Sequence, residues 1–383
     1  MAKTGSLILV GTGVKSLCQL TLEAIQELER ADIIYYAVRD ATLEGFIKKK
    51  NHRAVDLYQY FINDEQIPES DLYIQISEVI LGDVRKGLYV VGAFFGHPGL
   101  FMSSNRRALA IAQAEGYMAK MLPGISVDDC LLADLGIDPS FVGCLTCEAW
   151  DFLIHDHVGL LSRHVIMYEI GYLKPSGKSI KIDYYQILVA KLQEIYGDLH
   201  PLVNYTAATS PLMQPVIEHF TVGDLFKPDI RKRVTSASTL YFPPKDALQL
   251  NKFANQLLDQ GVITKEQLQH AMFPGRPLYQ LAGGALPPEA YSDHAQRVVA
   301  TLTDHKASPR CPVYRASSTM QATLEEIYLK SQLREKYLIS PASFAELLDS
   351  SLEDTERMAL ASGNYVEIEA AMKSGDLDEA IRK

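Results

Sequence analysis

The sequence contains 383 residues, of which 47% are hydrophobic and 22% are charged, a composition typical of a globular protein with room for more than one domain. The net charge is −10, which argues against sequence-independent binding of nucleic acid, because that activity needs a basic surface. We see no signal peptide and no membrane-spanning stretch. The scattered cysteines suggest free thiols, and although Cys144 and Cys147 form a C-x-x-C pair, no second pair or histidine cluster completes a zinc site. We therefore expect a cytoplasmic protein without a membrane segment or a metal site.

The first 244 residues alternate short β-rich runs with amphipathic helical stretches. This pattern predicts an α/β fold with a mostly parallel sheet covered by helices. The candidate strands are residues 6–10, 33–38, 88–95, 117–122, 164–171, 201–207 and 238–242. The clearest helix is predicted over residues 71–86, where apolar residues recur at three- and four-residue spacing.

After Pro243 and Pro244 the strand pattern disappears and helical stretches follow, with Gly- and Pro-rich connections between them. We expect helices within residues 247–260, 265–272 and 289–304, and a run of short helices over residues 319–382. The predicted domains are an α/β domain at 1–244, with subdomains of about 1–120 and 121–244, a helical segment at 245–315 and a small helical domain at 316–383.

Three glycine-containing turns each follow a predicted strand. We call them the glycine turns: Gly11-Thr12-Gly13, Gly96-His97-Pro98-Gly99 and Leu122-Pro123-Gly124-Ile125-Ser126. Open α/β sheets bind ligands at the carboxyl ends of their strands, and glycine lets a ligand approach the backbone. The third glycine of a dinucleotide fingerprint would fall at Ser16, so a nicotinamide or flavin cofactor is not expected.

The glycine turns together resemble those of the tetrapyrrole-methylase fold, a two-subdomain α/β fold of class III methyltransferases that bind S-adenosylmethionine. Residues 56–60, 84–88, 124–135 and 144–149 resemble the borosin-type peptide α-N-methyltransferases. Residues 316–373 resemble the helical precursor domain of that family. The resemblance therefore covers nearly the whole chain and implies an all-helical C-terminal clasp and precursor-like region beside the methyltransferase domain.

The resemblance implies an activity and a partner arrangement. The enzyme would methylate backbone amides of a ribosomally made peptide (RiPP), convert S-adenosylmethionine to S-adenosylhomocysteine, and act on a peptide that is fused to its own C-terminus or supplied in trans. It would form an interlocked homodimer in which residues 245–315 clasp the partner. The sequence ends at Lys383 without an apolar core peptide.

The resemblance also assigns site residues. It places the catalytic tyrosine at Tyr73, which the apolar stripe alone would make a core residue. Tyr58 and Tyr60, in a strand-like run, are further candidates, because a tuned tyrosinate can act as a base. The predicted cofactor-binding residues are Gly11, Gly13, Phe95, His97, Pro98, Gly99, Leu100, Ser126, Glu169, Tyr205, Ala207, Ser238 and Thr239. Backbone contacts should dominate, with side-chain bonds to adenosine from Glu169 and Tyr205.

Three positions depart from the family pattern. Glu69 stands where the family has an arginine one helical turn before the catalytic tyrosine, and a carboxylate there would raise the pKa of a neighbouring tyrosine. Phe61 and Phe95 stand in place of tyrosines. An alternative is therefore a catalytically impaired homologue that binds S-adenosylmethionine and a peptide. A methyltransferase for a tetrapyrrole or another small molecule would leave the helical C-terminal domain unexplained.

Overall fold

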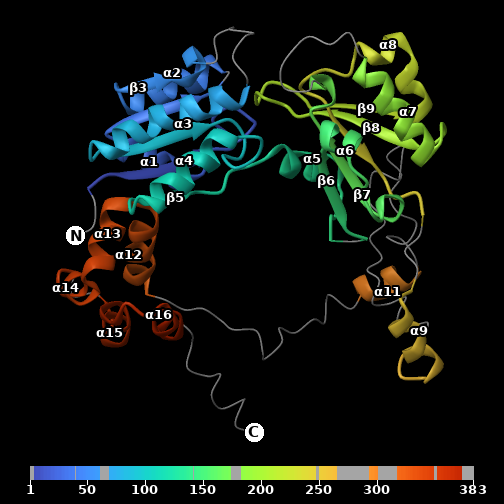
Figure 1. Cartoon of the computed structure of the whole chain (residues 1–383). Helices are drawn as coiled ribbons and strands as arrows, with labels where there is room; N and C mark the ends of the chain where they lie inside the picture. Colours follow the sequence, from blue (N-terminus) through green and yellow to red (C-terminus); the bar gives the residue numbers. More distant parts are fainter. Residues whose placement is uncertain are drawn as a thin grey trace. The chain divides into compact units, whose positions relative to one another are not determined.

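The computed structural model describes residues 4–38, 40–60, 69–140, 142–173, 183–246, 250–264, 293–300, 317–348 and 352–372. The chain divides into two compact units, Met1–Leu20 with Asp32–Leu286 and Thr21–Ala31 with Pro287–Lys383. The first unit holds both β-sheets, and the described residues of the second unit fold into helices (Figure 1).

The first sheet is parallel throughout, with the strand order β3-β2-β4-β1-β5. Its strands are β1 (Ser6–Gly11), β2 (Ile33–Ala37), β3 (Ala54–Asp56), β4 (Tyr89–Phe94) and β5 (Met118–Met121). β1 and β2 are buried along their whole length, as expected for a parallel sheet covered by helices. The helices of this half are α2 (Ala41–Lys50), α3 (Glu69–Arg85), α4 (Ser103–Ala114) and the short 3-10 helix η1 (Leu57–Tyr60).

Helix α3 confirms the helix predicted from the apolar stripe. Ile76, Ile80 and Val84 are buried and pack in one core with Leu7 and Val90 of the first sheet. Burial of side chains of this size stabilises the fold by about 1.5–3 kcal/mol each. The apolar stripe therefore fixes which face of α3 meets the sheet.

The second sheet has the strand order β6-β7-β10-β8-β9. Its strands are β6 (Cys144–Glu148), β7 (His164–Tyr168), β8 (Pro201–Thr206), β9 (Val216–Thr221) and β10 (Thr239–Phe242). β6 and β7 are parallel, whereas β10 is antiparallel to β7 and β8, and β8 is antiparallel to β9. The prediction of one mostly parallel sheet was therefore wrong for this half, where the short β8–β9 connection makes neighbouring strands antiparallel.

Helices also pack in this half of the first unit. They are α5 (Val127–Leu135), α6 (Ala149–Ile154), α7 (Tyr184–Tyr196) and α8 (Pro228–Arg231), with 3-10 helices η2 (Leu160–Ser162), η3 (Ile170–Tyr172) and η4 (Val222–Phe226). Leu188, Val189 and Leu192 of α7 are fully buried in the core of this half together with Val165 and Leu240. Each half of the first unit therefore has its own hydrophobic core.

Each predicted strand overlaps an observed strand, but β3, β6 and β9 were not predicted. β3 is only three residues long, and β9 is an edge strand that carries Glu218 and His219. The strand-like run predicted at Tyr58 and Tyr60 was wrong, because both residues belong to η1. The carboxylate Oδ1 of Asp56 accepts the backbone N–H of Tyr58 at 2.9 Å, a local turn that ends β3.

Two helices are described between residues 245 and 315, namely α9 (Lys252–Asp259) and α11 (Asp293–Ala300). They fall within the predicted stretches 247–260 and 289–304, of which residues 247–249, 289–292 and 301–304 lie outside the described residues, as does the helix predicted at 265–272. Of the helices in the described part of the chain, none is long and apolar enough to cross a membrane.

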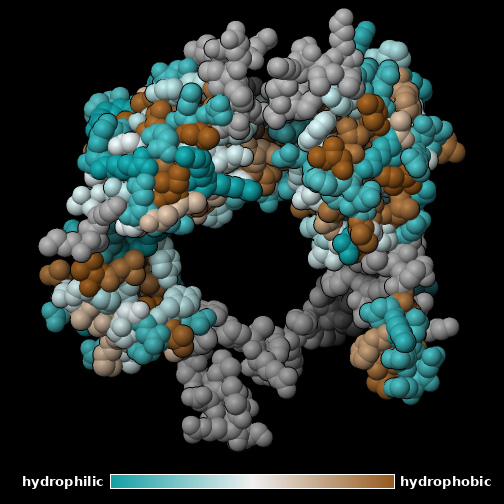
Figure 2. All heavy atoms as spheres, viewed as in Figure 1, coloured by the Kyte–Doolittle hydropathy of each residue, from teal (hydrophilic) through white to brown (hydrophobic). Residues whose placement is uncertain are grey.

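The second unit contains α1 (Leu22–Arg30) and the helices α12 (Ser318–Leu329), α13 (Ser331–Ile339), α14 (Pro341–Glu346), α15 (Asp354–Ser362) and α16 (Tyr365–Ala371). Its core includes Met320, Tyr337 and Leu360, and the Tyr337 hydroxyl donates to the Leu360 carbonyl at 3.0 Å. Apolar side chains also remain exposed on these helices, Ile339 at 84% and Val366 at 69% among them (Figure 2). The run of short helices predicted over residues 319–382 is confirmed over the described residues up to 372, and residues 373–382 lie outside the described part of the chain.

Candidate active site

The three glycine turns lie against one another in the first unit. Gly13 and Gly96 pair through two backbone hydrogen bonds, from Gly13 N to Gly96 O at 3.3 Å and from Gly96 N to Gly13 O at 3.0 Å. A Cβ atom added at Gly124 would lie 2.8 Å from Gly11 Cα and 3.0 Å from Gly96 O. One added at Gly11 would lie 2.9 Å from Pro98 Cδ and closer still to Gly96 O. Any side chain would force these backbones apart, so glycine is required where the turns converge.

Backbone conformation and a hydroxyl group hold the first two turns together. Gly13 (φ +73°) and Gly96 (φ +68°) occupy the left-handed region that favours glycine. The backbone N–H and the hydroxyl of Thr12 both donate to the Phe94 carbonyl, at 2.8 and 3.2 Å. The turn after β1 is thereby tied to the end of β4.

Polar groups of α4 hold the loop that follows β4. The carbonyl of Pro98 accepts Asn105 Nδ2 at 2.8 Å. The carbonyl of Gly99 accepts Arg106 Nε at 3.1 Å and Nη2 at 2.7 Å. Within the loop, His97 Nδ1 accepts the Gly99 N–H at 3.0 Å. Hydrogen bonds from α4 and a hydrogen bond within the loop therefore fix the loop conformation.

The residues of this loop differ in how far they are exposed to solvent. Pro98 and Gly99 are buried, and His97 and Leu100 are half-buried. Phe95, which stands where the family has a tyrosine, is 44% exposed. A ligand at the glycine turns would therefore meet the Phe95 ring and the loop backbone.

Helix α5 begins directly after the third glycine turn, with Ser126 as its N-cap. The Ser126 hydroxyl accepts the Asp129 N–H at 3.2 Å and donates to Asp129 Oδ2 at 2.7 Å, and the Ser126 N–H donates to the same carboxylate at 2.7 Å. This reciprocal capping box stabilises the first turn of the helix. Ser126 therefore shapes the turn with its own polar hydrogens.

The cofactor residues predicted in the second half gather at one edge of the second sheet. Glu169 follows β7, Ala207 follows β8, and Ser238 precedes β10. Because β10 is antiparallel to β7 and β8, its amino end meets their carboxyl ends. Tyr205 and Thr239 are direct partners in the register of β8 and β10. The fold brings these five residues to a common edge.

Carboxylates of α5 hold two tyrosines at this edge. The hydroxyl of Tyr205, a fully buried residue, donates to Asp134 Oδ2 at 2.7 Å, and the hydroxyl of Tyr168 donates to Asp128. Burial, reinforced by the neighbouring carboxylate, raises the pKa of each phenol. Tyr205 therefore contributes packing and backbone groups to the edge, and its hydroxyl is committed to Asp134.

Contacts between the two halves bring the glycine turns next to this edge. The Ser16 N–H donates to the Thr209 carbonyl at 2.9 Å, which links the segment after β1 to the loop after β8. The rings of Phe101 and Tyr168 meet edge to face at 4.9 Å between centroids. Val14 packs into a buried cluster with residues of α5 and the second sheet. The turns and the edge are neighbouring walls of one candidate site.

The candidate catalytic tyrosines come from two elements that contact each other. Tyr73 lies in α3 and is half-buried, and Tyr58 and Tyr60 lie in η1, half-buried against the core of the first sheet. η1 packs against α3. Glu69 is the first residue of α3, and Phe61 lies outside the described residues.

A large cavity lies elsewhere in the first unit. It measures about 990 Å³ and is lined by residues of α6, η2 and α7, including Phe152, Leu160 and Lys191. The Lys191 ammonium group donates to the carbonyls of Phe152 and His155, both at 2.9 Å, and so caps the end of α6. The lining contains no predicted site residue. The candidate site at the glycine turns therefore lies apart from this cavity.

The Cys144–Cys147 pair lies in β6, where burial raises the pKa of Cys144 to about 11 and that of Cys147 to about 12. Both thiols are protonated at neutral pH. In the part of the chain that the structure describes, no group of three potential metal ligands is present.

Sequence reasoning missed the residues that brace the site. These are Asn105, Arg106 and Arg107 of α4 and Asp128 and Asp134 of α5. An Arg-Arg pair soon after a glycine turn is visible in the sequence. Its partners belong to other elements, so its role could be seen only in the folded structure.

Comparison with family models identifies two parts of the chain. Residues 6–225 match the model of the Tetrapyrrole (Corrin/Porphyrin) Methylases, and residues 290–382 match the Borosin biosynthesis clasp domain. The predicted tetrapyrrole-methylase fold with a helical C-terminal region is thereby confirmed. The domain boundaries predicted at 120, 244 and 315 stay predictions.

Two curated relatives extend over most of the chain. The methyltransferase/ribosomally synthesized cyclic peptide dendrothelin A precursor of Dendrothele bispora is 38% identical, over 97% of this chain and 89% of that protein. The corresponding omphalotin A precursor of Omphalotus olearius is also 38% identical, with the same coverage. Among solved structures, uroporphyrin-III-C-methyltransferase from Thermus thermophilus aligns with a TM-score of 0.45 and 16% identity over 68% of this chain and 98% of that chain. The chain therefore belongs to the tetrapyrrole methylase family and, within it, to the borosin-type methyltransferases.

Proposed function

We propose that the protein transfers methyl groups from S-adenosylmethionine to backbone amide nitrogens of a ribosomally made peptide. The observation that carries this proposal is the convergence of the three glycine turns beside the edge of the second sheet, in a chain of this family. The two curated relatives are named both as methyltransferases and as cyclic peptide precursors, which supports a peptide substrate.

The glycine turns suit a cosubstrate that is recognised through backbone groups. Gly11 and Gly124 let the turns pack closely, a Cβ added at Gly96 would meet nothing within 4 Å, and the exposed Phe95 ring offers an apolar surface. Glu169, exposed after β7, is the side chain we assign to a hydrogen bond with the ribose or adenine. We assign the remaining cofactor contacts to His97, Pro98, Leu100, Ser126, Tyr205, Ala207, Ser238 and Thr239.

S-adenosylmethionine supplies a methyl group on a sulfonium and leaves as a neutral thioether. The protein must therefore activate the peptide amide, whose N–H is a very weak acid. We assign to Tyr73 the phenolate that takes the amide proton as the nitrogen forms its bond to the methyl carbon. Tyr58 and Tyr60 would orient the amide, since η1 packs against α3. Positioning and preorganised electrostatics supply most of the barrier reduction in such a reaction.

A second candidate function rests on the departures from the family pattern. Glu69 stands where the family has an arginine, and a carboxylate disfavours ionisation of any phenol close to it. Phe95 lacks the hydroxyl that the family has next to the second glycine turn. These residues favour a homologue that binds S-adenosylmethionine and a peptide but turns over slowly or not at all.

Mass spectrometry separates the two functions. The purified full chain is incubated with S-adenosylmethionine, once with an apolar peptide fused after Lys383 and once with the same peptide in trans. We expect mass increments of one methylene on backbone amides, and the productive arm shows whether the substrate acts in cis or in trans. Cofactor binding by calorimetry without increments in either arm would establish the binding homologue, and absence of cofactor binding would overturn the proposal.

The Tyr73→Phe variant tests the assigned base. Removing the phenol should lower the rate of methylation by about 10²–10⁴-fold, the usual contribution of a general base. S-adenosylmethionine affinity should be unchanged. Tyr184→Phe in α7 is the matched control and should keep full activity. A fully active Tyr73→Phe variant would remove Tyr73 from the mechanism.

We further propose that residues 245–315 clasp a second copy of the chain. α9 has no buried residue, and Phe253 on it is 66% exposed. In Figure 2 this helix shows apolar atoms along one side, next to a hydrophilic surface. An uncovered apolar helix face in a long chain usually marks an interface. Light scattering should give a dimer for the full chain, and a monomer at micromolar concentration would contradict the clasp.

A further inference from the structure

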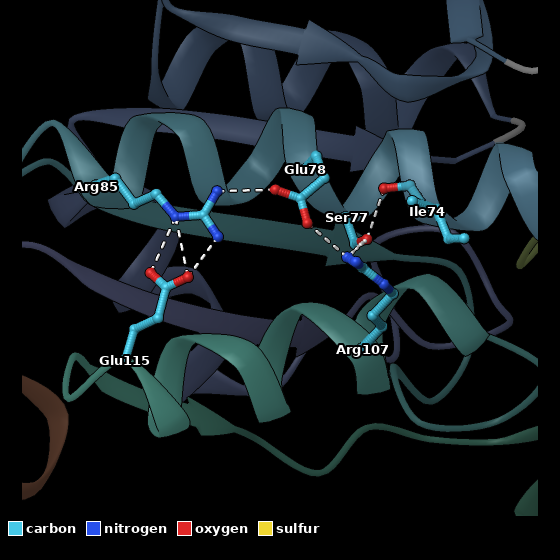
Figure 3. A network of polar contacts seen from close by, with 6 residues as sticks. All are labelled: Ile74, Ser77, Glu78, Arg85, Arg107 and Glu115. Carbon is cyan, nitrogen blue, oxygen red and sulfur yellow. Dashed lines mark hydrogen bonds and ion pairs between the residues drawn. The ribbon is translucent and has the colours of Figure 1, made fainter.

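Three consecutive residues of α4 reach toward two different parts of the candidate site. Asn105 and Arg106 contact the loop after β4, whereas Arg107 contacts α3 (Figure 3). The loop carries proposed cofactor contacts, and α3 carries Tyr73. One short stretch of one helix therefore touches both reactant-binding sides.

The contacts to the loop restrict its movement. Asn105 is fully buried and holds the Pro98 carbonyl, and Arg106 places two N–H groups on the Gly99 carbonyl. A guanidinium that donates twice to one acceptor has a defined orientation, and hydrogen bonds to a charged group are stronger than neutral ones. The loop is thus fastened to the first turns of α4.

The contacts to α3 end beside Tyr73. Arg107 Nη1 donates to Ser77 Oγ and to Glu78 Oε1, both at 2.7 Å. Ser77 is fully buried, and its hydroxyl donates in turn to the Ile74 carbonyl at 2.7 Å. Arg107 is therefore linked through one hydroxyl to the residue that follows Tyr73.

Tyr73 lies where α3 emerges from the core. Among the described side chains of residues 71–75 none is buried, and burial begins at Ile76 and Ser77. Tyr73 and Ser77 are four residues apart and so lie on the same face of the helix. Arg107 thus holds the helix at the turn that supports Tyr73.

We propose that Asn105, Arg106 and Arg107 are positioning residues that fix the cofactor loop and the Tyr73 helix in one relative position. This inference rests on the proposed function. The methyl donor would be placed by the loop and the base by α3, and the reaction requires both within a fraction of an ångström, since displacement by about 1 Å can cost 10²-fold in rate. Loosening the loop should therefore change both the affinity for S-adenosylmethionine and kcat, whereas loosening α3 should change kcat alone.

Arg85 provides a matched control from the same network. It donates to Glu78 at 2.8 Å and to Glu115 at 2.5–3.2 Å, at the far end of the α3–α4 contact (Figure 3). The guanidinium of Arg85 does most to hold the pKa of the Glu78 carboxyl below its usual range, and that of Arg107 adds to the effect. Arg85 thus shares the carboxylate and the charge of Arg107 but touches neither Ser77 nor the loop.

The test compares Arg106→Gln, Arg107→Gln, Arg107→Lys and Arg85→Gln in the full chain with the peptide substrate that the wild type accepts. Arg106→Gln should raise the Kd for S-adenosylmethionine about tenfold and also lower kcat, because the loop both binds and places the methyl donor. Arg107→Gln should lower kcat about 100-fold with an unchanged Kd. Arg107→Lys should recover part of kcat, and Arg85→Gln should resemble the wild type.

Hydrogen exchange of the α3 amides gives a readout that needs no activity. We expect faster exchange at residues 73–77 in Arg107→Gln than in Arg85→Gln. Equal effects of Arg85→Gln and Arg107→Gln on kcat and hydrogen exchange would overturn the proposed positioning role of Arg107, because α3–α4 packing alone would explain them. If the wild type proves inactive, the proposed function fails. The Kd of Arg106→Gln for S-adenosylmethionine and the hydrogen exchange of α3 in Arg107→Gln then still decide whether these residues fix the loop and the helix.

Discussion

The two halves of the first unit build their walls of the site by different means. The parallel half offers backbone, since Gly11, Gly96 and Gly124 bring three strand ends together without side chains. The antiparallel half offers an edge whose tyrosines are fixed, as Tyr205 is by Asp134. The difference indicates that the first wall is sensitive to added atoms and the second to lost hydrogen bonds.

The largest effect is expected where the backbone segments converge. Gly11→Ala places a methyl group against Pro98 and Gly96, so we expect the free energy of unfolding to fall by about 3 kcal/mol and cofactor binding to be lost. Gly45→Ala in α2 is the control, because its Cβ would meet nothing within 4 Å. It should stabilise the helix by about 0.5–1 kcal/mol. Urea unfolding and calorimetry measure both quantities, and a Gly11→Ala variant with normal affinity would refute the glycine requirement.

A smaller effect is expected in the second wall. Tyr205→Phe removes the hydrogen bond to Asp134 and should cost about 1 kcal/mol of stability. Cofactor affinity should stay the same, because the hydroxyl is committed to α5. Tyr185→Phe, which removes a hydrogen bond to the Leu225 carbonyl, is the control for hydroxyl loss away from the site. If calorimetry shows that Tyr205→Phe alone weakens binding, its phenol contacts the ligand.

The smallest effect concerns Asp128, whose pKa burial raises above its ordinary value, with Asp129 adding to the rise. The folded state then binds the proton more tightly than the unfolded state, so this group stabilises the fold at low pH and loses that contribution as pH rises through the raised pKa. Asp128→Asn keeps an acceptor for Tyr168. Its stability relative to the wild type should be higher at pH 7 than at about pH 4. Thermal unfolding of both proteins at the two pH values measures this difference, and a variant that is no more stable relative to the wild type at pH 7 than at about pH 4 would contradict the prediction.

The sequence predicted the features that depend on local pattern. Apolar runs located β1, β2 and β4, and the stripe from Ile76 to Val84 located α3. The glycine turns were visible because glycine after a strand is a local signal. The very short strand β3 and the edge strand β9 were not predicted, because pairing with neighbouring strands stabilises them more than their own residues do.

The site itself could be predicted only in part. The positions of Gly11, Gly96 and Gly124 were recognised, but their mutual contact depends on the order of strands in the folded sheet. The same holds for Arg107, whose partner Ser77 lies on another helix. The antiparallel return of β10 placed Ser238 and Thr239 at the edge, which no local pattern encodes.

The backbone pairing of Gly13 with Gly96 has a consequence for timing. Gly13 and Gly96 are far apart in the sequence, and pairing of such distant segments is slow because the long loop between them must first be closed. While only the first glycine turn has emerged from the ribosome, Gly13 has no Gly96 to pair with, so the converged glycine turns are not yet formed. Binding of the methyl donor would then require the first sheet to be complete. A fused peptide substrate would not be methylated before the methyltransferase domain had finished folding.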